Sequence, residues 1–245
     1  MQNIGSTERE KDSQLLARRA QQVQRGGARA SVLGINDGLV SILCLVLGVA
    51  AASGDQNAVL TAGFAGVIAG AFSMAAGEWI SMRSQVDLFE GVLHDLKRLI
   101  RRDRELLEEN LVKHLVHDGY NRTTAIAATK ELAEDNDGFF KTYAEQVIGI
   151  NPHELGSPWA AAISSFLLFV AGSLAPLGPW LFTEGVTAIW ASIILTGMGG
   201  IITGAYVAYS SGKSLWRGAL RQFVIIAGVS AITYSIGALF GTVIG

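Results

Sequence analysis

Charged residues and cysteine are both scarce in this sequence. Only 16% of its 245 residues are charged, and residues 56–77, 185–212 and 222–245 carry no charged side chain at all. Each of these stretches is long enough to cross a bilayer as a helix, which takes about 20 residues. The single cysteine, Cys44, excludes an intrachain disulfide. The composition therefore predicts an integral membrane protein.

The sequence also lacks the signatures of enzymes and of nucleic-acid-binding proteins. It contains no glycine-rich phosphate loop, no nucleophile elbow and no set of cysteines at zinc-binding spacing. Its charged segments mix both signs too evenly to form a nucleic-acid surface. We therefore expect no enzymatic activity, no permanently bound cofactor and no nucleic-acid partner.

Two more apolar stretches complete a set of five predicted spans. One runs from about Val32 to Ser53 with Asp37 as its only charge, and the other runs from Trp159 to Leu174 inside an uncharged segment. All 19 Lys and Arg lie in residues 1–29, 83–141 and 213–221, whereas the loops 54–57 and 175–184 have none. Because cytoplasmic loops are rich in Lys and Arg, the N-terminus and the central segment are predicted to be cytosolic.

The fold class predicted is an all-α integral membrane protein with a cytosolic helical module between the second and third of five spans. Four segments are expected: a cytosolic arm or amphipathic helix at residues 1–30, two spans at 31–83, the module at 84–155, and three spans at 156–245.

Four helices are predicted inside the module from its apolar periodicity and its capping residues. The first continues out of the second span through Phe89–Ile100. The others start near Leu107 and end at Gly119, run from a cap at Asn121 or Thr123 to about Ala133, and run from Phe139 to Ile148 with Gly149 as the terminating residue.

Asp37 and Glu78 are the only two charged residues inside the hydrophobic stretches of the chain. A carboxylate at membrane depth costs about 2.5 to 3.5 kcal/mol even on the lenient insertion scale, so it is typical of a bundle interior, a water path or a cation site. This favours a membrane transporter. Two alternatives stay open: Asp37 as a cap bonded to the backbone of its neighbours, and Glu78 as a residue that reaches headgroup water.

Small residues follow helical spacing in three of the spans, which predicts close helix packing. The stripes are Gly34, Asp37, Ser41, Cys44 and Gly48 in the first span, Gly63, Gly66, Gly70, Ser73 and Gly77 in the second, and Gly237, Gly241 and Gly245 at the end of the chain. Beside the second stripe, Gly66, Gly70, Met74, Glu78 and Met82 form an adjacent row at i+4 spacing. Packing explains most of these glycines, but it does not explain Asp37, Met74 and Glu78.

The blocks GINDGLVS at residues 34–41 and GAFSMAAGEW at residues 70–79 resemble the signature of the vacuolar iron transporter family, in its bacterial or nodulin-like branch. The resemblance implies a homodimer of five-helix protomers that exchanges a divalent metal, chiefly Fe²⁺ and sometimes Mn²⁺, for protons, along a path between the subunits lined by the first span. By position, Asp37 and Met74 resemble metal-path residues of the family. Gly66 stands where some members carry a glutamate, and we expect Glu78 to supply that carboxylate.

A carboxylate with a methionine on a neighbouring helix suits Fe²⁺ better than Mg²⁺ or Ca²⁺, because iron accepts both oxygen and thioether ligands. Burial favours the protonated carboxyl, whereas an arriving cation favours the ionised form and expels the proton. Exchange of metal for protons would follow from this competition.

The central module departs from the family, whose members often carry glutamate-rich helices there. Asn110 and Lys113 fall near expected glutamates, and Tyr143 and Val147 near an expected methionine and glutamate. A remaining set, Glu105, Glu109 and His114, has the helical spacing of a metal site. The alternative is a solvated face balanced by neighbouring basic residues.

Two functional hypotheses result. The first is an Fe²⁺ or Mn²⁺/proton antiporter that exports metal from the cytosol, with membrane lipid and a second copy of the chain as its other partners. The second is a non-transporting scaffold or metal sensor that acts through its cytosolic module. A bacterial inner membrane is expected rather than an organelle membrane.

Overall fold

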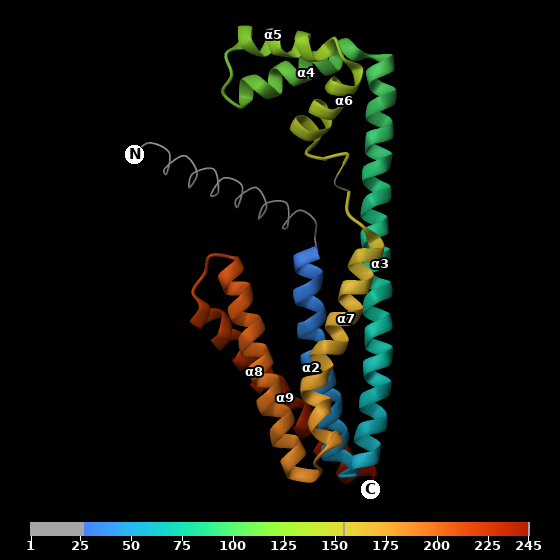
Figure 1. Ribbon diagram of the computed structural model, residues 1–245, viewed down its shortest axis with the longest axis vertical. Coiled ribbons are helices and arrows are strands. Elements are labelled where there is room, and N and C mark those ends of the chain that lie inside the picture. Colours follow the sequence, from blue (N-terminus) through green and yellow to red (C-terminus); the bar gives the residue numbers. More distant parts are fainter. Residues whose placement is uncertain (1–26, 154, 245) are drawn as a thin grey trace, which may run out of the picture. The chain divides into compact units, whose positions relative to one another are not determined.

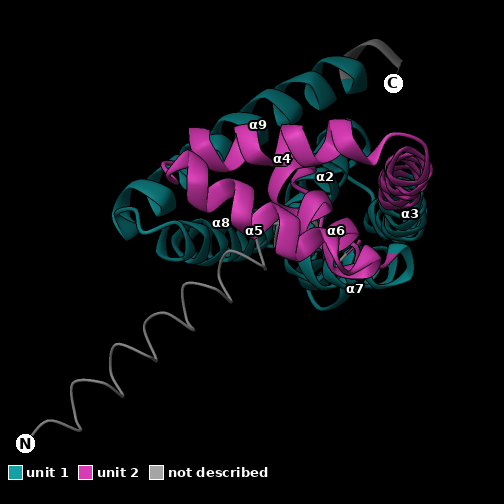
Figure 2. Ribbon diagram, turned by 90° about the horizontal axis from the view of Figure 1, so that it is seen from above, with its two compact units in different colours: residues 1–80, 158–245 teal, residues 81–157 magenta. Residues whose placement is uncertain are grey.

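The computed structural model of the protein describes residues 27–153 and 155–244, and every regular element within these ranges is a helix. The arm predicted over residues 1–30 lies outside the described residues except for its last four, which begin helix α2 (Gly27–Ser53). The chain divides into two compact units, residues 1–80 with 158–245 and residues 81–157 (Figure 2). We call them unit 1 and unit 2.

Five described helices are long and apolar enough to cross a membrane. They are α2, α3 (Gln56–Arg102), α7 (Pro158–Leu177) followed by the 3₁₀ turn η2 (Gly178–Leu181), α8 (Gly185–Ser210) and α9 (Leu215–Ile244) (Figure 1). The five predicted spans are confirmed, and the protein is a multi-pass membrane protein. The helix predicted to leave the second span is also confirmed, because α3 is one helix of 47 residues.

Two predicted boundaries were wrong. The third span does not end at Leu174: α7 continues through Pro176 to Leu177, and η2 carries the chain on to Leu181. Pro176 and Trp180 are both almost completely buried, so this continuation belongs to the packed core of unit 1. The fifth helix begins at Leu215, ahead of the uncharged stretch 222–245 from which the span was predicted, and therefore includes Arg217 and Arg221. A long cationic side chain on a helix can extend its charged end out of the apolar layer into water. Arg217 and Arg221 therefore do not mark the beginning of the helix.

Helix α2 lies at the centre of unit 1 and packs against α7, α8 and α9. The contact with α9 uses the predicted small-residue stripe: a Cβ on Gly237 would lie 2.4 Å from the Gly48 carbonyl oxygen, and one on Gly241 would lie 2.7 Å from that of Ala52. These backbones meet because glycine has no side chain to separate them. Gly245 is outside the described residues.

Unit 2 contains the end of α3, α4 (Arg104–His117), α5 (Arg122–Ala133), α6 (Asn136–Tyr143) and a π-helical turn, η1 (Ala144–Ile148). Its apolar core includes Leu107, Leu111 and Phe139, each at most 2% exposed. The last predicted helix begins at Asn136, earlier than Phe139, because the Asp135 carboxylate accepts hydrogen bonds from the N–H groups of residues 137 and 138.

The helix ends predicted in unit 2 are confirmed. Gly119 and Gly149 adopt left-handed φ angles of 98° and 80°. After α4, the N–H of Tyr120 donates to the Leu115 carbonyl and that of Gly119 to the Val116 carbonyl, which is a Schellman motif. Of the two residues proposed to cap the next helix, Asn121 is the one that does so, through the N–H of Thr123.

Candidate functional site

The helices of unit 1 leave one side of α2 partly uncovered. Ser41 is exposed, and Asp37, Cys44 and Gly48 are half-buried, whereas Leu43 and Leu47 on other sides of the helix are almost completely buried. The predicted polar stripe therefore coincides with the uncovered side of α2 at Asp37, Ser41 and Cys44, whereas Gly48 is packed against Gly237 of α9. Its fifth predicted member, Gly34, is buried, and a Cβ there would lie 3.0 Å from the Ser165 carbonyl oxygen of α7.

Asp37 lies in the interior of α2, where the Ser41 hydroxyl donates a hydrogen bond to its Oδ1 atom over 2.6 Å. The side chain therefore caps no helix end, and its hydrogen-bond partner is a hydroxyl group one turn further along the helix. Ser41 is exposed, so the pair stands at the surface of unit 1. The geometry offers a carboxylate and a neighbouring hydroxyl oxygen, which are hard oxygen ligands, to whatever lies against this side of α2.

Gln222 adjoins this site and was missed by sequence reasoning. Its side-chain Nε2 group donates a hydrogen bond to the Asn36 Oδ1 atom, next to Asp37 in the chain. Glycines make room for it, since a Cβ on Gly204 would lie 2.9 Å from the Gln222 Cβ atom. The signal was present, because Gln222 is an amide at the start of an otherwise apolar segment. A hydrogen bond between side chains of two spans holds α9 against α2 at this level.

The row on α3 that includes Met74 and Glu78 faces inward in unit 1. Met74 is half-buried and packs against the apolar core around Phe169, and Glu78 is also half-buried. At Gly66, where the resemblance implied a missing glutamate, a Cβ would lie 2.3 Å from the Leu45 Cδ2 atom. The space beside Gly66 is therefore occupied by Leu45, and a carboxylate there would require Leu45 to move.

Phe169 of α7 lies against both α2 and α3. Its carbonyl oxygen lies 2.2 Å from a Cβ built on Gly38, and its ring carbon Cζ lies 2.3 Å from one built on Gly70. Gly38 and Gly70 thus both lie against Phe169, and Met74 and Glu78 follow Gly70 about one and two helical turns later along α3. Among the described residues, no three His, Cys, Asp or Glu side chains lie together in a way that could hold a metal ion. Metal binding by Asp37, Met74 and Glu78 stays a prediction.

The side chains of Glu105, Glu109 and His114 on α4 are engaged separately or open to solvent. Glu109 forms an ion pair with Lys113 at 2.9 Å, and His114 lies 3.4 Å from Asp118. Glu105 is exposed in the first turn. The hydrogen bond from Lys113 and its positive charge lower the pKa of Glu109 below the ordinary value of 4.5. These pairs favour the solvated-face alternative, and metal binding by the three residues stays a prediction.

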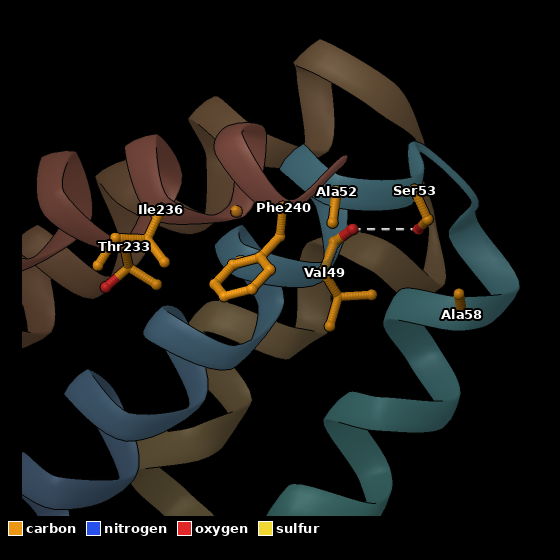
Figure 3. A pocket seen from close by; sticks show the side chains of 9 residues that line it. Val49, Ala52, Ser53, Ala58, Thr233, Ile236 and Phe240 are labelled. Carbon is orange, nitrogen blue, oxygen red and sulfur yellow. Dashed lines mark hydrogen bonds between the residues drawn. The ribbon is translucent and has the colours of Figure 1, made fainter. Parts of the chain in front are cut away.

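A hollow of about 320 Å³ continues the uncovered side of α2 toward its C-terminal end (Figure 3). It is lined by Gly48, Val49, Ala52 and Ser53 of α2, Ala58 of α3, and Thr233, Ile236, Gly237 and Phe240 of α9. The Ser53 hydroxyl donates to the Val49 carbonyl within the same helix over 3.0 Å. The hollow is therefore apolar, and it offers no charged ligand for a cation.

Comparison with known proteins assigns the family. Vacuolar iron transporter homolog 1 of Oryza sativa subsp. japonica is 32% identical over 219 residues, which are 87% of this chain and 73% of that protein. The vacuolar iron transporter of Acanthamoeba castellanii is 32% identical over 223 residues, 89% and 80% of the two chains. Vacuolar iron transporter homolog 2 of the same rice is 32% identical over 223 residues, 88% and 91% of the two chains. The model of the VIT family matches residues 28–238, and this chain belongs to that family.

Proposed function

We propose that this protein is a divalent metal/proton antiporter that carries Fe²⁺, and also Mn²⁺, out of the cytosol. The observation that carries the proposal is a carboxylate, Asp37, on the uncovered side of a membrane-spanning helix whose other sides are packed. A charge in such a place is typical of an ion path. The names of the relatives, which describe iron transporters, support iron as the substrate.

Competition between a cation and a proton for Asp37 supplies the exchange. In a membrane, the carboxyl group is favoured in its neutral form when no cation is near, and a bound Fe²⁺ favours the ionised form. Metal entering from one side thus displaces a proton, and a proton from the other side displaces the metal. The thioether of Met74 adds a soft ligand that Mg²⁺ and Ca²⁺ bind poorly, which would favour Fe²⁺.

A homodimer would complete the ligand set. One chain brings no three acidic, histidine or cysteine side chains together within its described residues, so a single copy offers too few ligands for a stable Fe²⁺ site. A two-fold axis beside the uncovered side of α2 would place two copies of Asp37 beside one path. The apolar hollow lined by Gly48 and Phe240 continues that side, which supports its burial against a second copy.

The distribution of charge supports a cytosolic location for unit 2. Within unit 1, the Lys and Arg among residues 32–80 and 158–241 all fall in the segment 213–221, and the connections 54–55 and 182–184 on the opposite side of the membrane contain none. Basic connections stay in the cytosol. The expectation of a bacterial inner membrane stays a prediction, since the three relatives named above are proteins of a plant and an amoeba.

Uptake of Fe²⁺ into proteoliposomes with a pH reporter inside tests the proposal. We expect the wild-type protein to couple metal flux to proton flux, and Asp37→Asn to reduce both to the level of empty vesicles while the protein stays folded and dimeric. Glu184→Gln is the matched control, because Glu184 is an exposed carboxylate whose side chain caps no N–H group. Undiminished flux in Asp37→Asn would refute the assignment of Asp37. Absence of flux from the wild-type protein at every pH gradient would favour the scaffold or sensor hypothesis instead.

A further inference from the structure

The connection between α8 and α9 and the first two turns of α9 carry three cations that have no carboxylate partner among the described residues. Lys213, Arg217 and Arg221 are all exposed. None of them forms an ion pair within the described part of the chain, whereas Arg83, Arg98, Arg104 and Lys113 do. We call these three residues the basic cluster. Residues 32–80 and 158–241 of unit 1 contain no other Lys or Arg.

The backbone fixes the basic cluster at the end of the α8–α9 hairpin. Gly212 ends α8 with a left-handed φ of 65°, and the N–H of Lys213 donates to the Ala208 carbonyl over 2.8 Å, as in a Schellman motif. Helix α9 begins two residues later. Arg217 and Arg221 are then one helical turn apart and lie on the same face of α9.

Exposed aromatic and apolar side chains surround the basic cluster. Trp216 is 72% exposed, and Leu220 and Phe223 continue from it at i+4 and i+7 along α9. Tyr206 and Tyr209 are exposed at the adjoining end of α8. Tryptophan and tyrosine are enriched at the level of lipid headgroups, because one part of the ring is apolar and the other donates a hydrogen bond.

We propose that the basic cluster binds the headgroup of an anionic phospholipid, with an acyl chain lying along Trp216, Leu220 and Phe223. Charge complementarity identifies the headgroup, since cations outside the apolar layer with no protein carboxylate beside them attract phosphate. The apolar stripe next to the cluster distinguishes a lipid from a soluble anion, which would contact the cations alone. The surface is independent of the metal path and of the proposed transport activity.

The expected preference follows from the number of cations. Each Lys or Arg near an anionic membrane surface contributes about 1 kcal/mol, which corresponds to about a fivefold change in affinity. Removal of all three cations is therefore expected to weaken binding of an anionic lipid by about 100-fold if the contributions add. Binding of a zwitterionic lipid should change little.

Lipid titration of the purified full-length protein in detergent, followed by native mass spectrometry, tests this inference. The probes are dioleoyl phosphatidylglycerol and dioleoyl phosphatidylcholine, and the variant is K213Q/R217Q/R221Q. The control is R101Q/R102Q/K130Q, which removes one Lys and two Arg from exposed positions of unit 2. R217Q alone serves as a second variant with a smaller expected loss, about fivefold, in case the triple variant fails to fold.

We expect the wild-type protein and the control variant to bind phosphatidylglycerol at least tenfold more tightly than phosphatidylcholine, and the triple variant to lose that preference. An equal loss in the control variant would show that net charge alone is responsible and would overturn the proposal. Full retention of the preference in the triple variant, or in R217Q when only that variant folds, would overturn it too. Displacement of phosphatidylglycerol by millimolar inorganic phosphate would identify a soluble-anion site and so reject the lipid.

Discussion

The crossing of α2 and α7 gives the strictest test of the packing around Asp37. A Cβ on Gly38 would lie 2.2 Å from the Phe169 carbonyl oxygen and 3.1 Å from the Phe169 Cα atom. A Cβ on Gly172 would lie 2.3 Å from the Ile35 carbonyl oxygen. Each helix therefore presents a glycine to the backbone of the other. Backbone atoms cannot rotate away as a side chain can, so Gly38→Ala forces the two helices apart by about 1 Å to restore an ordinary contact.

Overpacking of this kind costs about 1 to 3 kcal/mol of stability. For a chain of this length, that corresponds to a loss of about 2 to 12 °C in melting temperature. Alanine is about 1 kcal/mol better than glycine as a helix former, so part of the loss will be offset. Gly228→Ala is the matched control, because Gly228 lies in α9 and a Cβ there meets nothing within 4 Å. The difference between the two variants isolates the effect of the close contact.

Thermal unfolding of the detergent-solubilised protein, followed by tryptophan fluorescence, measures this difference. We expect Gly38→Ala to melt below the wild-type protein and Gly228→Ala to melt at or slightly above it. The double variant Gly38→Ala/Gly172→Ala should lose less stability than the sum of the two single variants, because one displacement of the helices relieves both contacts. A melting temperature of Gly38→Ala equal to that of Gly228→Ala would refute the close approach of α2 and α7.

Two further predictions concern polar contacts. Gln222→Leu removes the donor to Asn36, and we expect a loss of about 1 kcal/mol of stability together with slower Fe²⁺ uptake; an unchanged melting temperature would contradict the contact between α9 and α2. Lys113→Gln should raise the pKa of Glu109 toward 4.5, which ¹³C NMR titration of the carboxyl group would detect. Because the folded pKa of Glu109 lies below its ordinary value, the pair stabilises the fold above pH 4.5, and this contribution is lost as the pH falls through the folded pKa. A pKa of Glu109 that does not respond to Lys113→Gln would exclude that cause.

Much of the candidate site followed from local pattern. The stripe that contains Asp37 and Ser41 could be placed on one face of a helix, because side chains three and four residues apart share a face whatever the helix packs against. The sequence could not show which part of that stripe stays uncovered, because this depends on where α7 and α9 cross α2. Gly34 and Gly48 belong to the same stripe, yet Gly34 is buried against α7 and Gly48 faces α9. The contact between Gln222 and Asn36 joins residues 186 positions apart, so no local pattern contains it.

The sequence by itself determined the number of spans and the polar face of the first, because a bilayer requires about 20 apolar residues per helix and a buried charge is too costly to occur without a reason. It also determined the turns at Gly119 and Gly149, where a left-handed backbone favours glycine. Only the tertiary structure decided that α7 passes through Pro176 and that Leu45 fills the space beside Gly66. These outcomes depend on contacts between segments distant in the chain, whose energies outweigh local preference once the helices are packed.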